Sequence, residues 1–186
     1  DWVFNLDADE KVTQTLRDEI DEVLSAPVLD ANFIKIPWQT YLFGKPVHRG
    51  RYSTPQGKIF LNHEGVHFAN SQVHEALQIP EVKVKVLKSP LLHFSWRSYQ
   101  HMQEKHLKYA CMLAEEKQKK GKKSSLGFAI LRFFTDFLQQ YILRGGALDG
   151  KRGFFMALVL AQYGFHKYAA IAAAQMELKA NRLVDG

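Results

Sequence analysis

The sequence predicts an α/β protein built in two parts, with strands and one helix in residues 1–94 and helices in residues 95–186. Three observations lead to this prediction. Runs of β-branched and aromatic residues punctuated by Gly and Pro fill the first part. Apolar residues recur at helical spacing in the second part. The composition, 46% hydrophobic and 24% charged over 186 residues, is that of a folded globular chain.

The chain opens with the apolar run WVFNL at residues 2–6, which leads directly into Asp7, Asp9 and Glu10. A strand with one solvated face alternates apolar and polar residues, whereas a strand covered on both faces does not. The run therefore predicts a buried central strand that delivers three carboxylates at its end.

A helix is expected next. Thr13 is suited to its N-cap, and Pro27 ends it. One side of this helix is apolar through Leu16, Ile20, Val23 and Leu24.

Strands fill the rest of the first part. Residues 32–52 predict a strand, a turn and a loop, because they are rich in aromatics and broken by Pro and Gly. Residues 57–68 predict two short strands joined at Glu64-Gly65. VKVKVL at residues 82–87 alternates with period two, which predicts a strand with one solvated face.

Three helices are expected after Ser95. The first has one face formed by Met102, His106, Tyr109 and Leu113. The second begins near Ser125 and stops at Gly145-Gly146, because glycine commonly ends helices. Asp149 can cap the third.

Charge is divided unevenly along the chain. Residues 1–82 carry 7 Lys/Arg against 12 Asp/Glu, a net of −5, and residues 83–186 carry 18 against 7, a net of +11. This asymmetry predicts an acidic site in one part and an anionic partner for the other. The single cysteine, Cys111, excludes an internal disulfide and a multi-cysteine metal site.

The triplet Asp7-Ala8-Asp9 is the first candidate for chemistry. Ligands bind at the carboxyl ends of strands in open α/β sheets, and two carboxylates there suit Mg²⁺ or Mn²⁺. Both carboxylates meet one ion only if the chain turns at this point. A simple turn or capping cluster is the alternative. An EF-hand is excluded, because Val12 stands where its loop requires Gly.

Two further patterns contain histidine. HEGVH, His63 to His67, matches a zinc-protease motif, but that motif requires a helix, and Gly65 and the strand-like flanks argue against one. His74-Glu75 offers a further metal ligand and a general base, with a plain surface pair as the alternative.

The helical part also suggests partners. The lysine run 117–123 is either a solvated helix end or a contact for an anionic partner. Residues 153–174 approach the roughly 20 apolar residues that span a bilayer. Gln162, Gly164 and Lys167 in this segment favour immersion in a membrane surface over spanning.

Taken in order, several motifs resemble family 2 glycosyltransferases, in particular the lipopolysaccharide-core type described as β-1,4-glucosyltransferase-like. The motifs are DWVFNLDADEKVTQTLRDEI, YLFGK, VHEAL, LLHFSWRS and YILRGGALDGKRGFFMAL. NLDADE is shared across many family 2 enzymes, whereas LLHFSWRS and YILRGGALDG are specific to this subgroup. The resemblance covers essentially the whole chain.

The resemblance implies a GT-A fold, in which a Rossmann-like sheet binds a nucleotide-sugar and the Asp-X-Asp holds a divalent cation on the diphosphate. In that family the first strands and the pocket for uracil and ribose precede the Asp-X-Asp. The chain thus resembles the portion from the metal strand onward, with 1–94 a partial GT-A catalytic domain and 95–186 a basic, membrane- or acceptor-associated region. An exposed sheet edge would then favour self-association.

The family also implies a reaction: metal-dependent, inverting transfer of a sugar, expected to be glucose, from a UDP-sugar to a lipopolysaccharide inner-core acceptor. Asp7 and Asp9 would hold Mg²⁺ or Mn²⁺, with His74 as a further metal or phosphate contact. Glu75 would be the general base for the acceptor hydroxyl. Lys58 stands where the family usually has an Arg that could meet phosphate, and RYSTPQG replaces an aromatic, Asp-rich segment. These departures leave the choice of donor and acceptor open.

A lipid-linked acceptor implies a cytoplasmic enzyme, peripheral on the cytoplasmic face of the inner membrane. The alternative is a non-catalytic module that binds membranes or polyanions through the +11 part. Nucleic-acid binding is disfavoured, because the basic residues cluster at a helix end without interleaved stacking aromatics.

Overall fold

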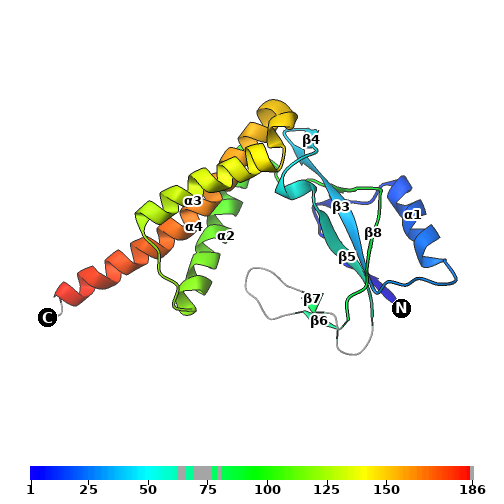
Figure 1. The fold of residues 1–186 in the computed structure, drawn as a ribbon, viewed down its shortest axis with the longest axis horizontal. Helices are drawn as coiled ribbons and strands as arrows, with labels where there is room; N and C mark the ends of the chain where they lie inside the picture. Colours follow the sequence, from blue (N-terminus) through cyan, green and yellow to red (C-terminus); the bar gives the residue numbers. More distant parts are fainter. Residues whose placement is uncertain (63–65, 69–76, 79–80, 185–186) are drawn as a thin grey trace. The chain divides into compact units, whose positions relative to one another are not determined.

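The computed structural model describes residues 1–62, 66–68, 77–78 and 81–184. The chain divides into two compact units, residues 1–97 and 98–186. The first holds the strands and one helix, and the second holds only helices, so the chain is a mixed α/β protein with a helical C-terminal part (Figure 1).

A seven-stranded sheet organises the first unit, with the order β1-β5-β3-β9-β2 and with β4 and β8 also paired to β3. β3 is its centre. The first half of β3 pairs antiparallel with β5 and parallel with β8, and the second half pairs antiparallel with β4 and parallel with β9. The strands are β1 (Trp2–Phe4), β2 (Glu10–Lys11), β3 (Phe33–Leu42), β4 (Lys45–Val47), β5 (Pro55–Leu61), β8 (Val84–Val86) and β9 (Leu91–His93).

The opening strand is not the buried central strand that the sequence predicts. Among the described residues β1 pairs only with β5, at one end of the strand order. Trp2 and Phe4 pack against the core, whereas Val3 between them is exposed. The strand therefore alternates between two faces, and because its residues are all apolar, the sequence hides that alternation.

The predicted helix is confirmed as α1 (Gln14–Leu24). The Thr13 hydroxyl accepts a hydrogen bond from the Leu16 N–H at 3.1 Å and caps its first turn. Its apolar side covers one face of the sheet (Figure 1). The buried core there comprises Leu16, Ile34, Ile36, Ile59, Leu87 and Leu91.

The predicted strand, turn and loop in residues 32–52 are confirmed. Phe43 and Gly44 both have positive φ, 51° and 73°, and connect β3 to β4. Two such residues form the tight turn whose twist suits antiparallel strands. The loop ends in the short 3-10 helix η1 (Arg51–Ser53).

The two short strands predicted in residues 57–68 are present as β5 and β6 (His67–Phe68), and the turn predicted at Glu64-Gly65 lies outside the described residues. In the described part of the chain, β5 pairs with β1 and β3, and β6 pairs with β7 (Leu77–Gln78). The prediction for residues 82–87 is wrong in detail. All three residues of β8 are exposed, rather than only one face, and Leu87 directly after it is the residue that enters the core.

The second unit is a set of helices in which α4 packs along both α2 and α3. Ser98 and Ser125 cap α2 and α3 by accepting backbone N–H bonds. The helices are α2 (Tyr99–Lys119), α3 (Leu126–Leu138), the π-helical turn η2 (Gln139–Leu143), the 3-10 turn η3 (Gly146–Asp149) and α4 (Gly150–Val184). None of the helices in the described part of the chain has both the length and the apolar content needed to cross a bilayer.

The buried face of α2 differs from the predicted one. Met102 and His106 are buried as expected, but Tyr109 is exposed. The face continues instead through Ala110 and Ala114. These small side chains lie four residues apart on the same side as His106 and let α4 approach closely.

Glycines set the turn between α3 and α4. Gly145 has φ 70°, which ends the preceding helical turn as the sequence predicts. Gly153 allows α4 to pass the turn closely, because a Cβ there would lie 1.7 Å from the Gly146 carbonyl oxygen.

This close approach predicts opposite effects for two Gly→Ala substitutions in helices. Gly153→Ala should lower the free energy of unfolding by about 2 kcal/mol, because backbone must move to admit the methyl group. Gly127→Ala in α3 should raise it by about 0.5–1 kcal/mol, because its nearest contact is Ser125 Oγ at 4.0 Å. Urea unfolding followed by circular dichroism measures both, and equal effects would contradict the packing.

Glu19 predicts a pH dependence of stability. Burial raises the pKa of this α1 carboxyl, but hydrogen bonds from the Lys88 and Ser89 N–H groups, 2.8 and 2.7 Å long, outweigh burial and lower its pKa. A lowered pKa stabilises the fold above the unfolded value of about 4.3, and this stabilisation is lost as the pH falls through the folded value. Glu19→Gln should therefore cost about 1 kcal/mol at neutral pH and progressively less below about pH 4. Glu22→Gln, an exposed position on the same helix, is the control and should change the free energy of unfolding at neutral pH by less than about 0.5 kcal/mol.

Candidate functional site

The carboxylates after β1 lie on a closed turn. The Glu10 N–H donates to the Asp7 carbonyl at 3.0 Å, and the Asp7 N–H donates to Glu10 Oε2 at 2.9 Å. The chain thus turns within the Asp7-Ala8-Asp9 triplet, as a shared cation site requires. β2 then pairs antiparallel with β9, and the Phe94 N–H donates to the Asp9 carbonyl at 2.8 Å.

Glu10 anchors this turn from the inside. Its side chain is fully buried. Oε1 accepts hydrogen bonds from Trp38 Nε1 at 2.6 Å and from Lys58 Nζ at 2.8 Å. Oε2 is engaged by the Asp7 N–H. With both oxygens used by the protein, Glu10 is a structural residue rather than a ligand for a substrate.

Lys58 on β5 is the cation of this cluster. Its side chain is 6% exposed, and Nζ lies 2.6 Å from Asp7 Oδ2 as well as 2.8 Å from Glu10 Oε1. Nζ also lies 5.5 Å from the centre of the Trp38 ring, within reach of a cation–π contact. A contact between Lys58 and a diphosphate stays a prediction, and in this arrangement the exposed Asp7 carboxylate stands between the ammonium and solvent.

Asp9 faces a second set of groups. Its Oδ2 lies 3.7 Å from Nε2 of His93, the last residue of β9. The Thr40 hydroxyl donates to the Tyr52 carbonyl at 2.7 Å, so it accepts from His93 Nδ1 at 3.2 Å. This chain of hydrogen bonds puts the proton on Nδ1 and directs Nε2 toward Asp9.

Aromatic rings surround these polar groups. The His93 ring stacks on Trp38 with centroids 4.1 Å apart and an interplanar angle of 15°. Trp38 also stacks on Tyr52 at 6.5 Å, and Tyr52 meets Trp96 edge to face at 5.1 Å. The rings hold the imidazole in one orientation and keep water from its buried side.

The roles of Asp7 and Asp9 as ligands for a divalent cation stay predictions. Asp7 and Asp9 carry half-exposed and partly exposed carboxylates on one turn, with His93 beside Asp9. In the described part of the chain, no three His, Cys, Asp or Glu side chains gather to hold a metal ion by themselves. Mg²⁺ commonly binds in this way, through one or two carboxylates together with substrate phosphates and water.

Two of the predicted site residues, His74 and Glu75, lie outside the described residues. Their roles as metal contact and general base stay predictions. Most of the zinc-protease pattern also lies outside, and His67, its last residue, is in strand β6 rather than a helix.

His93, Trp38 and Thr40 were not singled out by sequence reasoning. A signal for His93 was present, because Leu91, His93 and Ser95 alternate with exposed or half-buried neighbours and all three are buried. A histidine on the inner face of a strand needs a polar partner. The sequence does not say that this partner is Thr40, 53 residues away.

Comparisons with known proteins bear on what the site does. The chain is 25% identical to an uncharacterized glycosyltransferase of Rickettsia typhi and 24% identical to one of Rickettsia prowazekii, each over 99% of this chain. It is 28% identical to the lipopolysaccharide core biosynthesis glycosyltransferase LpsC of Rhizobium meliloti, also over 99% of this chain. Over nearly its whole length, the chain is thus similar to proteins named glycosyltransferases, one of them in lipopolysaccharide core biosynthesis.

The similarity covers only part of the length of these relatives. The chain spans 65% of the length of both rickettsial relatives and 68% of LpsC. No family model matches the chain, and no solved structure matches it.

The buried ion pair predicts a coupling between Lys58 and Glu10. Lys58→Met should lower the free energy of unfolding by about 3 kcal/mol, because it leaves a buried carboxylate without its cation. Adding Glu10→Gln should recover part of this loss, since the amide carries no charge. Denaturant unfolding of the two single variants and the double variant measures the coupling.

Lys83→Met is the matched control. Lys83 pairs with Asp30 at 2.6 Å, but both side chains are largely exposed. Its removal should cost less than about 1 kcal/mol. A similar cost at Lys58 and Lys83 would show that the pair at the turn is not buried in solution.

Proposed function

We propose that this chain is the metal- and acceptor-side portion of a family 2, GT-A-type glycosyltransferase. The reaction is inverting transfer of a hexose, glucose in the first instance, from a UDP-sugar to the saccharide of a lipopolysaccharide core. The proposal is supported by the similarity to proteins named glycosyltransferases, one of them in lipopolysaccharide core biosynthesis. The resemblance of the sequence motifs supplies the finer statement about donor and mechanism.

The observation that carries the proposal is the acidic turn. Its inner carboxylate, Glu10, is fixed by Trp38 and Lys58, while Asp7 and Asp9 remain accessible. A surface turn that served only to reverse the chain would not need a buried lysine and a tryptophan to hold it. This rigid support is what a binding constellation requires.

Each residue has a distinct part in this proposal. Asp7 and Asp9 would hold Mg²⁺ or Mn²⁺, which when bound supplies positive charge to a departing nucleoside diphosphate. Thr40 and Trp38 orient His93, which in turn stands next to Asp9. Lys58 limits the negative charge of the turn and fixes Asp7. Glu75 remains the proposed base that takes the proton of the attacking acceptor hydroxyl.

Metal binding provides the first test. In the protein that carries this chain, Asp9→Asn should weaken binding of Mn²⁺ in the presence of UDP at least about tenfold. Loss of a residue that only orients a metal ligand already weakens metal binding about 10- to 100-fold, and loss of the ligand itself should cost at least as much. Electron paramagnetic resonance of free Mn²⁺ measures this directly. In the protein that carries this chain, the same variant should abolish transfer from UDP-glucose to a heptose-containing core acceptor.

Asp21→Asn is the matched control, because Asp21 is an exposed carboxylate on α1 whose ion-pair contact with Arg17 is long, at 3.9 Å. It should leave Mn²⁺ binding, transfer and unfolding unchanged. Equal Mn²⁺ affinity in the two variants would refute the metal role of the turn. Full transfer activity in Asp9→Asn would refute its role in catalysis.

A further inference from the structure

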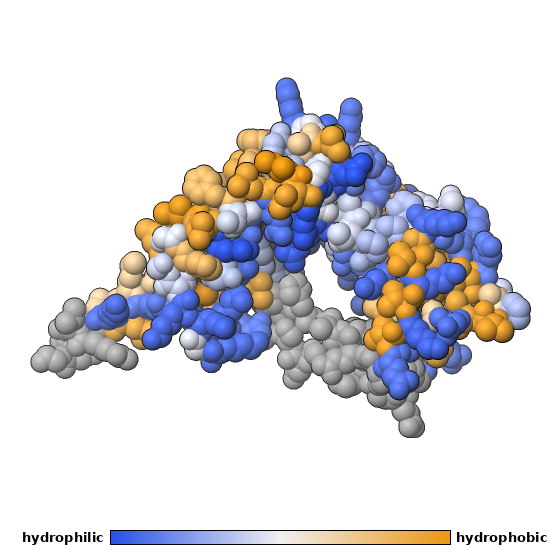
Figure 2. All heavy atoms as spheres, viewed as in Figure 1, coloured by the Kyte–Doolittle hydropathy of each residue, from blue (hydrophilic) through white to orange (hydrophobic). Residues whose placement is uncertain are grey.

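Helix α3 turns its apolar side chains outward. Ile130, Leu131, Phe134 and Leu138 recur at helical spacing along one side, Ile142 continues the row in η2, and all five are exposed. Figure 2 shows hydrophobic residues gathered over this helix and the turns that follow it. We call this row the α3 stripe. A helix on the surface of a globular protein normally shows water its polar side.

The charged side chains of α3 lie on the other side. Arg132 and Asp136 form an ion pair with each other, and the Asp136 side chain is 14% exposed. Asp136 lies against Gly164 of α4, where a Cβ would be 2.1 Å from its Oδ2. Arg132 stands over the Tyr168 ring at 5.8 Å, and its Nε is buried without a hydrogen-bond partner among the described residues.

Helix α3 thus carries apolar residues on both sides, with Ala129, Phe133 and Phe137 less exposed than the stripe, and its ion pair lies toward α4. Placing an ion pair between two helices has a desolvation cost that outward-facing charges would avoid. Leaving a row of large apolar side chains in water has a second cost. Both the inward ion pair and the outward apolar row are explained if the medium outside α3 is itself apolar.

Basic residues stand at both ends of the α3 stripe. Among residues 117–152 the only acidic side chains are Asp136, which faces α4, and Asp149. The Lys and Arg residues are 117, 119, 120, 122 and 123 before α3, 132 within it, and 144, 151 and 152 after it. An apolar row flanked by cations matches an anionic phospholipid surface, in which acyl chains lie beneath negative headgroups.

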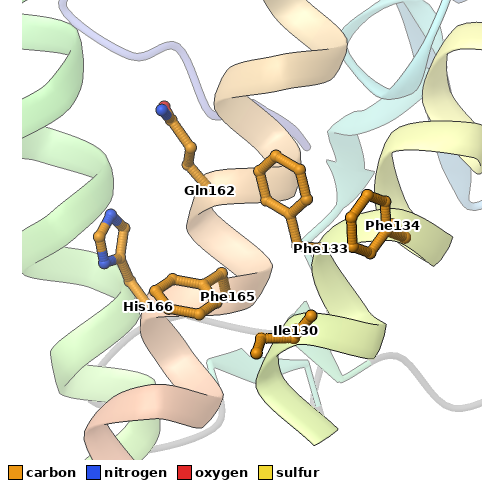
Figure 3. Close-up of a pocket in the computed structure, with 6 residues that line it drawn as sticks. All are labelled: Ile130, Phe133, Phe134, Gln162, Phe165 and His166. Atoms are coloured by element: carbon orange, nitrogen blue, oxygen red, sulfur yellow. The ribbon is translucent and has the colours of Figure 1, made fainter. Parts of the chain in front are cut away.

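A shallow groove accompanies the stripe. It has a volume of about 410 Å³ and lies between α3 and α4. Figure 3 shows Ile130, Phe133 and Phe134 of α3 on one side, opposite Gln162, Phe165 and His166 of α4. Because Ile130 and Phe134 belong to both, the groove extends the apolar surface of the stripe toward α4.

We propose that the α3 stripe docks on the surface of an anionic phospholipid bilayer. α3 has 13 residues, a length of about 20 Å. A helix needs about 20 residues to cross the hydrocarbon layer, so α3 lies in the interface instead of spanning it. The proposal goes beyond glycosyl transfer and does not depend on it, since it rests on α3 and its flanks alone.

Vesicle co-sedimentation of the whole chain tests this proposal. The unsubstituted chain should sediment with vesicles of phosphatidylethanolamine and phosphatidylglycerol, and less with vesicles of phosphatidylcholine alone. Phe134→Glu/Leu138→Glu should weaken binding to the anionic vesicles at least about tenfold, because it puts two charges into the apolar row. Lys122→Gln/Lys123→Gln should weaken it less and reduce its salt dependence.

Leu107→Glu/Leu178→Glu is the matched control. These residues are 48% and 61% exposed, close to 58% for Phe134 and 49% for Leu138, but lie on α2 and α4. The control should bind vesicles like the unsubstituted chain, and circular dichroism should show both double variants folded. Equal binding by both double variants would overturn the assignment to α3. The proposal would also be overturned if the unsubstituted chain did not bind vesicles. If that chain then formed a dimer that Phe134→Glu/Leu138→Glu dissociates, the stripe would be assigned to contact with a second copy.

Discussion

The burial of one lysine ammonium is the constraint on which the first unit depends. The side chain of Lys58 on β5 is almost completely buried, so its charge requires partners. It forms ion pairs with Glu10 and Asp7 on the turn after β1. Trp38 on β3 supplies its ring to the ammonium and its N–H to Glu10. Three segments distant in sequence are thereby fixed at one point. A charge buried in this way stabilises little by itself, but it disfavours any arrangement that leaves it unpaired.

The same constraint divides the acidic turn into an inner and an outer part. Glu10 has both oxygens engaged by protein groups, and so it serves the structure. Asp7 and Asp9 remain at the surface, one beside Lys58 and the other beside His93. The hydrogen bonds from Tyr52 through Thr40 to His93 orient the second of these neighbours. A turn supported on both sides in this way is suited to bind a ligand without reorganising, which fits the transferase names of the similar proteins.

The second unit differs in how one of its helices, α3, distributes polar and apolar side chains. Its helices are capped and terminated by ordinary local signals, but α3 carries large apolar side chains on its exposed side and an ion pair on the side toward α4. The interior of this unit therefore accommodates an ion pair beside Gly164, while large apolar side chains lie outside.

The sequence by itself determined the features that depend on neighbouring residues. The helix capped by Thr13, the turn at Phe43-Gly44, the stop at Gly145 and the helical second part follow from local propensity and spacing. Only the tertiary structure decided which strand is central, which side of α3 is buried, and that Glu10, Lys58 and His93 belong to one site. Those outcomes depend on pairing and burial between residues far apart in the chain, such as Thr40 with His93 and Glu10 with Trp38. A single sequence does not show which residues far apart in the chain will be in contact, because the strand order and the burial of each side chain are decided only when the whole sheet assembles.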